Sequence, residues 1–364
     1  MSGVISRRVF LAVTASFLAQ RVAAAPPSAS LRPIARGTEH FKKLVPSAET
    51  IVDSARLDGR VSFAVVDAQT GQRLEGANAK TGTPPASVAK AITALYALDV
   101  LGPLHRFITR LVVTGAVSNG VVHGDLILVG GGDPTLNTND LAEMAKALKA
   151  QGIREVRGAF KVAEGALPYV KSIDRDQPDH VGYSPAVSGI ALNYNRVHFQ
   201  WRRAGSGYGV TMDARTDRYR PQVAMAQMKI VNRDTPVYIY KGADGADTWT
   251  VARHALGQNG ARWLPVRKPA LYAGDVLQTL MRAHGIVLKA PKITDIIPVG
   301  TMLVEHQSED LKTILRAMLR FSTNLTAEMV GMSATAKRAG LVPSLKASAA
   351  EMNRWADAAL GAKG

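Results

Sequence analysis

The sequence predicts an α/β fold that is interrupted by a large, mostly β insertion. Apolar residues recur at helical spacing near both ends of the chain, whereas short strand-like runs separated by Gly, Asp and Asn dominate the middle. The 364 residues, 46% of them apolar, suffice for one large domain or two to three smaller ones. We therefore expect a leader at residues 1–25, one domain divided between 26–104 and 301–364, and an inserted region at 105–300.

The first 25 residues are typical of an export signal. Arg7 and Arg8 precede a short apolar run, and a group of small residues follows, so we expect cleavage near Ala24 and a periplasmic mature protein. The paired arginines favour the twin-arginine route. The alternative is a membrane anchor, but the eleven residues of the run 9–19 are too few to cross a bilayer.

The elements before residue 105 follow from local signals. Residues 46–57 have helical spacing and end at Asp58-Gly59, and 61–67 form a strand that pairs with Arg73-Leu74 across a turn at 69–71. A helix is expected from Ser87 to Leu101, where Gly102-Pro103 stops it.

Beyond residue 105 the sequence predicts strands first and helices later. The expected strands are 108–113, 126–129, 156–162, 197–201, 229–231 and 236–240. The expected helices are 139–150 and 273–284 within the insertion, then 309–319, 325–338 and 343–360.

Composition excludes several classes of chemistry. The chain has no cysteine, which excludes disulfides and thiolate nucleophiles, and its eight histidines lack the spacing of metal ligands, so no metal or organic cofactor is expected. The formal charge of +16, or +13 without Arg7, Arg8 and Arg21, favours an acidic partner. Because the basic residues are scattered, we expect wall or peripheral membrane association rather than nucleic-acid binding.

The glycine run 130–132 follows a predicted strand, as phosphate-binding loops do. It lacks the Gly-Lys-Ser/Thr of such loops, and Asp133 would repel an anion. We interpret the run as a structural turn.

Ser87 and Lys90 form the strongest local feature. Three residues apart on a helix, the two side chains share a face, and a lysine with a lowered pKa can take the proton of a serine nucleophile. The bare Ser-x-x-Lys pattern is expected about once by chance in a chain of this composition. The alternative is a surface helix whose N-cap is a serine.

Three further blocks add context: Ser322-Thr323-Asn324 between two helical stretches, and the unusual strings at 124–136 and 187–197. Together with Ser87-x-x-Lys90 they resemble the class C low-molecular-mass penicillin-binding proteins, D-Ala-D-Ala carboxypeptidases and endopeptidases of peptidoglycan. The 235 residues between Ser87 and Ser322 support the resemblance, because this family inserts extra domains between these two motifs.

The resemblance implies a penicillin-recognising, β-lactamase/transpeptidase-like catalytic domain that works without a cofactor. It implies that Ser87 is the nucleophile, that Lys90 assists it, that Ser322 relays a proton and that Asn324 binds the substrate backbone. The implied partners are peptidoglycan peptides as substrate and β-lactams as covalent inhibitors of the same serine.

Two departures from the family pattern qualify these expectations. The family has a Lys-Thr-Gly strand after Ser-x-Asn, but here the only such triplet is 80–82, which we interpret as an accidental turn, and the chain ends forty residues after Asn324. We therefore expect an incomplete catalytic domain that is inactive and poorly stable. A catalytically inactive wall-binding homologue and a basic polyanion-binding module are the alternatives.

The second departure lies in the insertion. Where relatives carry adjacent aspartates, this chain has the run 160–165, in which Glu164 is the candidate for contacting the substrate side chain. Glu328 is interpreted as a structural helix residue.

Overall fold

The computed structural model describes residues 46–243, 245–296, 299–340 and 342–361. The expected leader and its cleavage site lie outside these residues, so the export signal stays a prediction. The chain divides into two compact units, Met1–Pro84 and Pro85–Gly364, which are described separately.

The first unit contains helix α3 (Ala48–Ser54) and a hairpin of β1 (Phe63–Val66) and β2 (Arg73–Ala77). The hairpin is antiparallel and pairs Phe63 with Ala77. The triplet 80–82 lies in a turn after β2, in which the Thr81 N–H donates to the Asn78 carbonyl oxygen. This location agrees with the interpretation of the triplet as a turn.

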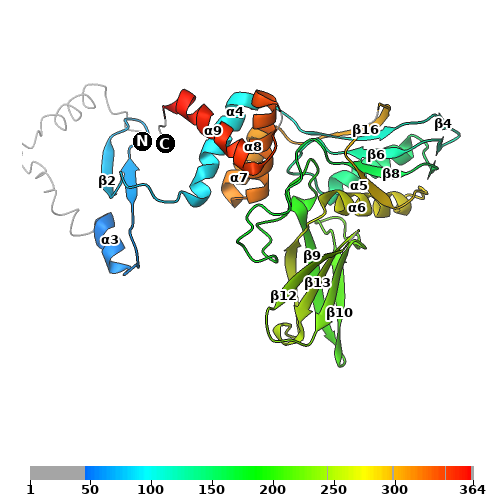
Figure 1. Ribbon diagram of the computed structural model, residues 1–364, viewed down its shortest axis with the longest axis horizontal. Coiled ribbons are helices and arrows are strands. Elements are labelled where there is room, and N and C mark those ends of the chain that lie inside the picture. The colour runs from blue at the N-terminus through cyan, green and yellow to red at the C-terminus, as the bar shows by residue number, and fades with distance from the viewer. Residues whose placement is uncertain (1–45, 244, 297–298, 341, 362–364) are drawn as a thin grey trace, which may run out of the picture. The chain divides into compact units, whose positions relative to one another are not determined.

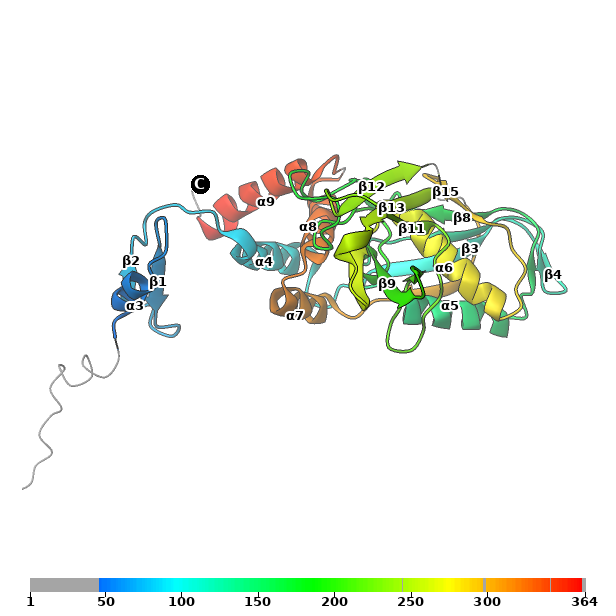
Figure 2. The same cartoon turned by 90° about the horizontal axis from the view of Figure 1, so that it is seen from below.

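Four helices of the second unit form a cluster in which α4 contacts the other three (Figures 1 and 2). They are α4 (Lys90–Leu101), α7 (Leu311–Phe321), α8 (Asn324–Ala339) and α9 (Leu345–Leu360). Their centre is closed by Tyr96 and Trp355, whose ring centroids lie 5.3 Å apart. Trp355 Nε1 donates to Asp99 Oδ2, and the Tyr96 and Thr335 hydroxyls share a hydrogen bond of 3.1 Å. These bonds join helices that are far apart in the sequence.

A five-stranded sheet forms the middle of the inserted region. Its order is β15 (Pro291–Thr294), β8 (Phe160–Ala163), β6 (Leu126–Val129), β3 (Ile108–Val113) and β16 (Thr301–Gln307). β15, β8 and β6 run parallel, and β3 is antiparallel to β6 and β16. Because β16 pairs with β3, the sheet extends to Gln307, beyond residue 300 where we expected the insertion to end.

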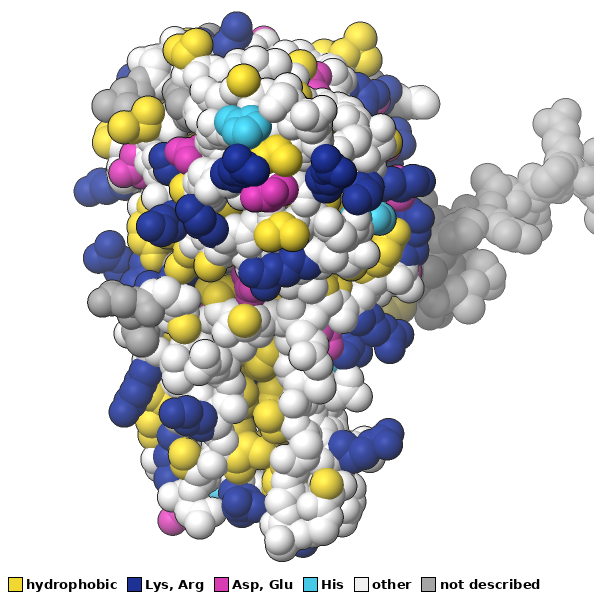
Figure 3. All heavy atoms as spheres, turned by 90° about the vertical axis from the view of Figure 1, so that its right-hand side faces the viewer, with side chains coloured by type: hydrophobic (Ala, Val, Ile, Leu, Met, Phe, Trp, Pro, Cys, Tyr) yellow, Lys and Arg dark blue, Asp and Glu magenta, His cyan; other side chains and the backbone are white. Residues whose placement is uncertain are grey.

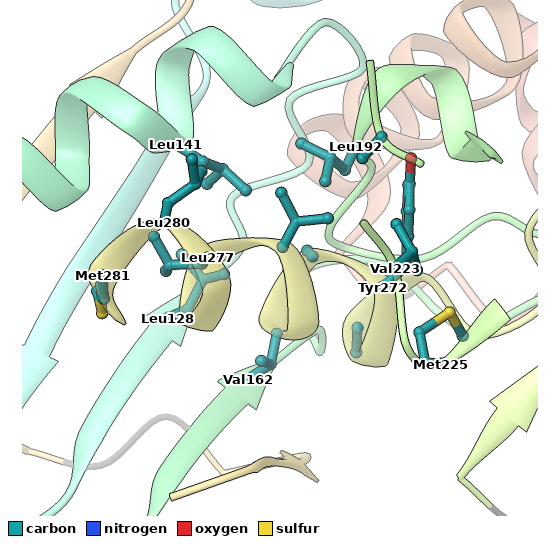
Figure 4. Close-up of a cluster of buried hydrophobic side chains, with 14 of the residues drawn as sticks. Leu128, Leu141, Val162, Leu192, Val223, Met225, Tyr272, Leu277, Leu280 and Met281 are labelled. Carbon is teal, nitrogen blue, oxygen red and sulfur yellow. The ribbon is translucent and has the colours of Figure 1, made fainter. Parts of the chain in front are cut away.

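Helices α5 (Thr138–Ala150) and α6 (Pro269–Ala283) pack against each other and cover one face of this sheet (Figure 1). Figure 4 shows Leu277 and Leu280 of α6 turned towards Leu128 of β6 and Leu141 of α5. All four side chains are buried, and burying one such side chain contributes about 1.5–3 kcal/mol. This core is separate from the hydrophobic cluster around α4, and it packs the helices of the inserted region against its sheet.

The remaining strands form three small sheets. These are β10 (Gly207–Asp213), β9 (Arg196–Ala204) and β14 (Asn259–Pro265); β11 (Ala226–Val231), β13 (Ala246–Ala252) and β12 (Tyr238–Ala243); and β4 (Val117–Ser118), β5 (Val121–Val122) and β7 (Glu155–Val156).

Most expected elements are present, and their bounds shift for physical reasons. The strand expected at 156–162 is two strands, β7 and β8, because the chain turns at Gly158, where a Cβ would collide with the Gly124 carbonyl oxygen. α6 begins four residues earlier than expected, at Pro269, since proline is favoured in the first turn of a helix. The run 130–132 is not the turn that we expected: the Gly130 and Gly132 N–H groups donate to the carbonyl oxygens of Ala163 and Gly189. It is close-packed irregular backbone, in which a Cβ on Gly131 would collide with Ile108.

Candidate active site

Ser87 lies in a 3-10 helix, Ala86–Ala89, that leads directly into α4. The expected helix is therefore present, with its first turn in the 3-10 form and α4 beginning at Lys90. In a 3-10 helix the side chains of residues i and i+3 eclipse each other. The tighter turn thus aligns the two side chains, and Lys90 Nζ donates to Ser87 Oγ at 3.1 Å.

Lys90 is buried, with 8% of its surface exposed, whereas Ser87 is exposed. Burial lowers the pKa of Lys90, and the negative charge of Glu328 acts in the opposite direction. An amine with a lowered pKa is unprotonated more often and can accept a hydroxyl proton. The pair therefore has the geometry and the electrostatics of an activated serine.

Ser322 ends α7 in the left-handed conformation, with φ 55° and ψ 41°. Its hydroxyl donates to Ser87 Oγ at 2.8 Å. Ala86, next to the other serine, also has a positive φ of 45°. Such conformations cost non-glycine residues about 1–3 kcal/mol each and are concentrated at functional sites. Here they flank the point where the two hydroxyls meet.

Asn324 begins α8, and its side-chain amide is held at both ends. Oδ1 accepts from Lys90 Nζ at 2.7 Å, and Nδ2 donates to the Tyr183 carbonyl oxygen at 3.1 Å. The structure thus brings together all four residues that the sequence singled out.

Tyr183 is the contact that sequence reasoning missed. It belongs to the inserted region, 141 residues from Asn324, and it contributes a backbone atom. No side-chain pattern marks a carbonyl group for such a contact, so only the folded chain could reveal it.

A small pocket of about 110 Å³ opens beside Ser322 and Asn324, and Tyr183, Tyr194 and Arg196 are among its lining residues. The Arg196 guanidinium lies 5.3 Å from the centre of the Tyr194 ring. Its Nε is buried and has no hydrogen-bond partner among the described residues. The pocket therefore combines aromatic walls with a cation.

The two glutamates singled out by the sequence lie in unexpected surroundings. Glu328, one helical turn after Asn324, is close enough to Lys90 for each charge to shift the other's pKa, and burial raises the pKa of Glu328. Its charge therefore acts on Lys90, while its interpretation as a structural helix residue stays a prediction. Glu164 lines a separate pocket with Ala336 and Gly340. At 1.5 Å per helical residue, Ala336 lies about 18 Å along α8 from Asn324, so Glu164 is distant from this site.

Among the described residues, no three His, Cys, Asp or Glu side chains are arranged to hold a metal ion. In the same part of the chain, no helix is long and apolar enough to cross a membrane.

The sequence of the chain is similar to that of known proteins. Residues 46–355 match the D-Ala-D-Ala carboxypeptidase 3 (S13) family. The chain is 28% identical over 360 residues to the D-alanyl-D-alanine carboxypeptidase of Actinomadura sp. (strain R39), an alignment that covers 92% of this chain. It is 25% identical over 291 residues to the D-alanyl-D-alanine carboxypeptidase DacB of Haemophilus influenzae, covering 74% of this chain. The two alignments span 64% and 57% of these relatives' own lengths.

Solved structures give the same answer for the fold. The crystal structure of penicillin binding protein 4 from Haemophilus influenzae superposes with a TM-score of 0.65, covering 81% of this chain and 67% of that one, at 20% identity. A second structure of that protein, in complex with a β-lactam, also has a TM-score of 0.65, covering 85% and 68% at 19% identity. These matches confirm the predicted fold class, an α/β fold with an inserted β-rich region.

Proposed function

This chain belongs to the D-Ala-D-Ala carboxypeptidase 3 (S13) family, and from that premise we propose that it is a serine-type D-alanyl-D-alanine carboxypeptidase or endopeptidase acting on peptidoglycan peptides. The observation that carries the proposal is the contact set around Ser87. Its oxygen lies within hydrogen-bond distance of both Lys90 Nζ and the Ser322 hydroxyl.

In the proposed acylation step, Ser87 Oγ attacks the carbonyl carbon of the penultimate D-alanine while Lys90 takes the hydroxyl proton. The C–N bond then breaks, and the leaving amine receives a proton through the Ser322 hydroxyl. An ester joins the shortened peptide to Ser87. Water, deprotonated by Lys90, hydrolyses this ester and restores the serine. Asn324 orients the substrate backbone beside the nucleophile.

β-Lactams are proposed as covalent inhibitors of the same serine. Their amide bond occupies the place of the peptide bond, so Ser87 Oγ would open the ring and remain acylated. The structure of a relative in complex with a β-lactam supports this proposal.

Labelling with a fluorescent penicillin tests the proposal. The sequence alone led us to expect an inactive chain, but the contacts of Ser87 with Lys90 and Ser322 are formed, so we now expect the chain to be labelled. Ser87→Ala should abolish labelling. A D-Ala-D-Ala peptide should lose its terminal residue when incubated with the unsubstituted chain but not with Ser87→Ala. Equal labelling of the chain and Ser87→Ala would refute the assignment of the nucleophile.

The inactive wall-binding homologue remains a second candidate. It is favoured by the one Lys-Thr-Gly triplet of the 364 residues, 80–82, which precedes Ser87 and lies in a turn of the first unit. Basic side chains are spread over the face in Figure 3, as binding to an acidic wall polymer requires. A chain that sediments with purified peptidoglycan but is not labelled by penicillin would favour this candidate.

Export to the periplasm is also proposed, on the basis of Arg7-Arg8 and the small residues before Ala25. N-terminal sequencing of the protein from a periplasmic fraction should begin near Ala25. Replacing both arginines by lysine should block export by a twin-arginine route but spare export by a general secretory route. A cytosolic protein that retains Ser2 would contradict the proposal.

A further inference from the structure

The segment 171–184 borders the candidate site without being part of any helix or strand. Tyr183, whose carbonyl oxygen holds the Asn324 amide, lies near its end. A segment without ladder hydrogen bonds depends on side chains to satisfy and fix its backbone. The position of the Tyr183 carbonyl therefore depends on whatever holds this segment.

Arg267 contacts the segment at both ends and in the middle. Its guanidinium donates to the carbonyl oxygens of Ser184 at 2.7 Å, Asp179 at 2.8 Å and Lys171 at 3.0 Å. Only 2% of the residue is exposed. Hydrogen bonds from a charged donor in a buried place are about twice as strong as neutral ones, so these three bonds hold the segment firmly. We call Arg267 and the three carbonyl groups that it binds the clamp.

Arg267 is itself fixed in the inserted region between β14 and α6. Its backbone N–H donates to Asp247 Oδ2 at 2.7 Å, and Tyr240 donates to the other carboxylate oxygen at 2.8 Å. The Tyr169 hydroxyl donates to the Arg267 carbonyl oxygen at 2.9 Å. The clamp is thus attached to a rigid network.

The contacts continue from the clamp to the nucleophile. Because Asn324 Nδ2 is bound to the Tyr183 carbonyl, its Oδ1 is turned towards Lys90, which in turn contacts Ser87. If the segment moved, the amide would lose the partner that selects this orientation.

We propose that Arg267 is a positioning residue of the active site, which holds the 171–184 segment so that the Tyr183 carbonyl orients the Asn324 amide towards Lys90. This inference rests on the proposed function for its effect on catalysis, but its structural part can be tested without turnover. Arg267 touches neither the nucleophile nor the substrate peptide bond in this mechanism. It acts through Tyr183 and Asn324.

The decisive measurement is the titration of the Lys90 amine, followed by NMR in protein with ¹³C-labelled lysine and assigned by Lys90→Arg. The hydrogen bond that Asn324 Oδ1 accepts from Lys90 Nζ favours the charged form of the amine. Loss of this hydrogen bond therefore lowers the pKa of Lys90. We expect Asn324→Ala and Arg267→Met to lower the Lys90 pKa by equal amounts, and the double variant to match either single one. An unchanged Lys90 titration in folded Arg267→Met would overturn the proposal.

A matched control is Arg233→Met. Arg233 also donates to backbone carbonyl oxygens of the inserted region, those of Pro236, Val237 and Thr250, but not to the 171–184 segment. This variant should leave the Lys90 titration unchanged, and an equal shift in it would assign the effect to general loosening. If Arg267→Met does not fold, Arg267→Lys and Ser184→Ala take its place in the same titration. Both should weaken the contacts that hold the 171–184 segment, and neither removes the buried positive charge.

Acylation by penicillin then tests the link to catalysis. We expect Arg267→Met to slow acylation of Ser87 by about a hundredfold, a magnitude typical of misplaced catalytic groups. In the Asn324→Ala background, Arg267→Met should not slow acylation any further. If the two substitutions acted independently, their effects on the acylation rate would multiply, and this result would contradict the proposal that Arg267 acts through Asn324. Absent acylation in the unsubstituted chain would refute the proposed function, while the Lys90 titration would still decide the positioning role.

Discussion

The hydroxyls of Ser322 and Ser87 lie 2.8 Å apart although 235 residues separate them in the sequence. Ser322 reaches this position in a left-handed conformation at the end of α7, before α8 begins. The backbone at this junction is therefore as important to the site as the hydroxyl that it carries.

Substitution of Ser322 can separate the hydroxyl from the backbone. Ser322→Ala and Ser322→Gly both remove the proton relay, and each should slow acylation of Ser87 by about a hundredfold to ten-thousandfold. Glycine adopts a positive φ without strain, so the glycine variant should be more stable than the alanine variant by about 1 kcal/mol. Urea denaturation measures the difference, and equal stabilities would contradict the strain at Ser322.

Acylation of Ser87 should depend on the protonation of Lys90. Because burial lowers the Lys90 pKa, the rate should rise with pH with a midpoint below the ordinary lysine value of 10.5. Lys90→Arg should be inactive, since an arginine keeps its proton at these pH values. Stopped-flow acylation with penicillin gives the profile, and a midpoint at or above 10.5 would argue against Lys90 as the base.

Glu328→Gln should shift that profile. The Glu328 carboxylate raises the Lys90 pKa, so its removal should move the midpoint of the acylation profile to lower pH. Glu351→Gln is the control, because Glu351 is paired with Arg338 near the other end of α8. An identical midpoint in Glu328→Gln and the unsubstituted chain would mean that the two charges do not interact.

The contact between α4 and α9 should contribute measurably to stability. Trp355→Phe removes the hydrogen bond to Asp99 and part of the ring packing on Tyr96, at an expected cost of about 1–3 kcal/mol. Trp263→Phe, at a site that is 38% exposed, should cost less. Urea denaturation of both variants checks the order, and the reverse order would indicate that α9 is weakly docked.

Limited proteolysis tests how far the folded region extends. The sequence alone led us to expect a resistant core within 105–300, with both helical ends degraded. The structure instead buries Tyr96, Met318 and Val330 in a second cluster, although Val88 in the 3-10 helix and Ile92 on α4 remain exposed. We therefore expect the resistant fragment to begin near Pro85. A fragment that begins near 105 would restore the first expectation.

The sequence by itself determined the elements and the chemistry that arise between near neighbours. Helical and alternating periodicity predicted most helices and strands, and the spacing of Ser87 and Lys90 aligned two side chains one turn apart. The motif context identified Ser322 and Asn324 as well. Each of these signals is local, or is carried by side-chain identity, and can therefore be read along the chain.

Only the tertiary structure decided how these residues are held. Tyr183 contributes a backbone carbonyl and Arg267 binds three others, and neither kind of contact has a side-chain signature in the sequence. The closeness of Glu328 to Lys90 likewise depends on how α8 packs against α4. Contacts between residues far apart in the chain form only when buried surfaces bring distant segments together, because local conformational preference carries no information about them.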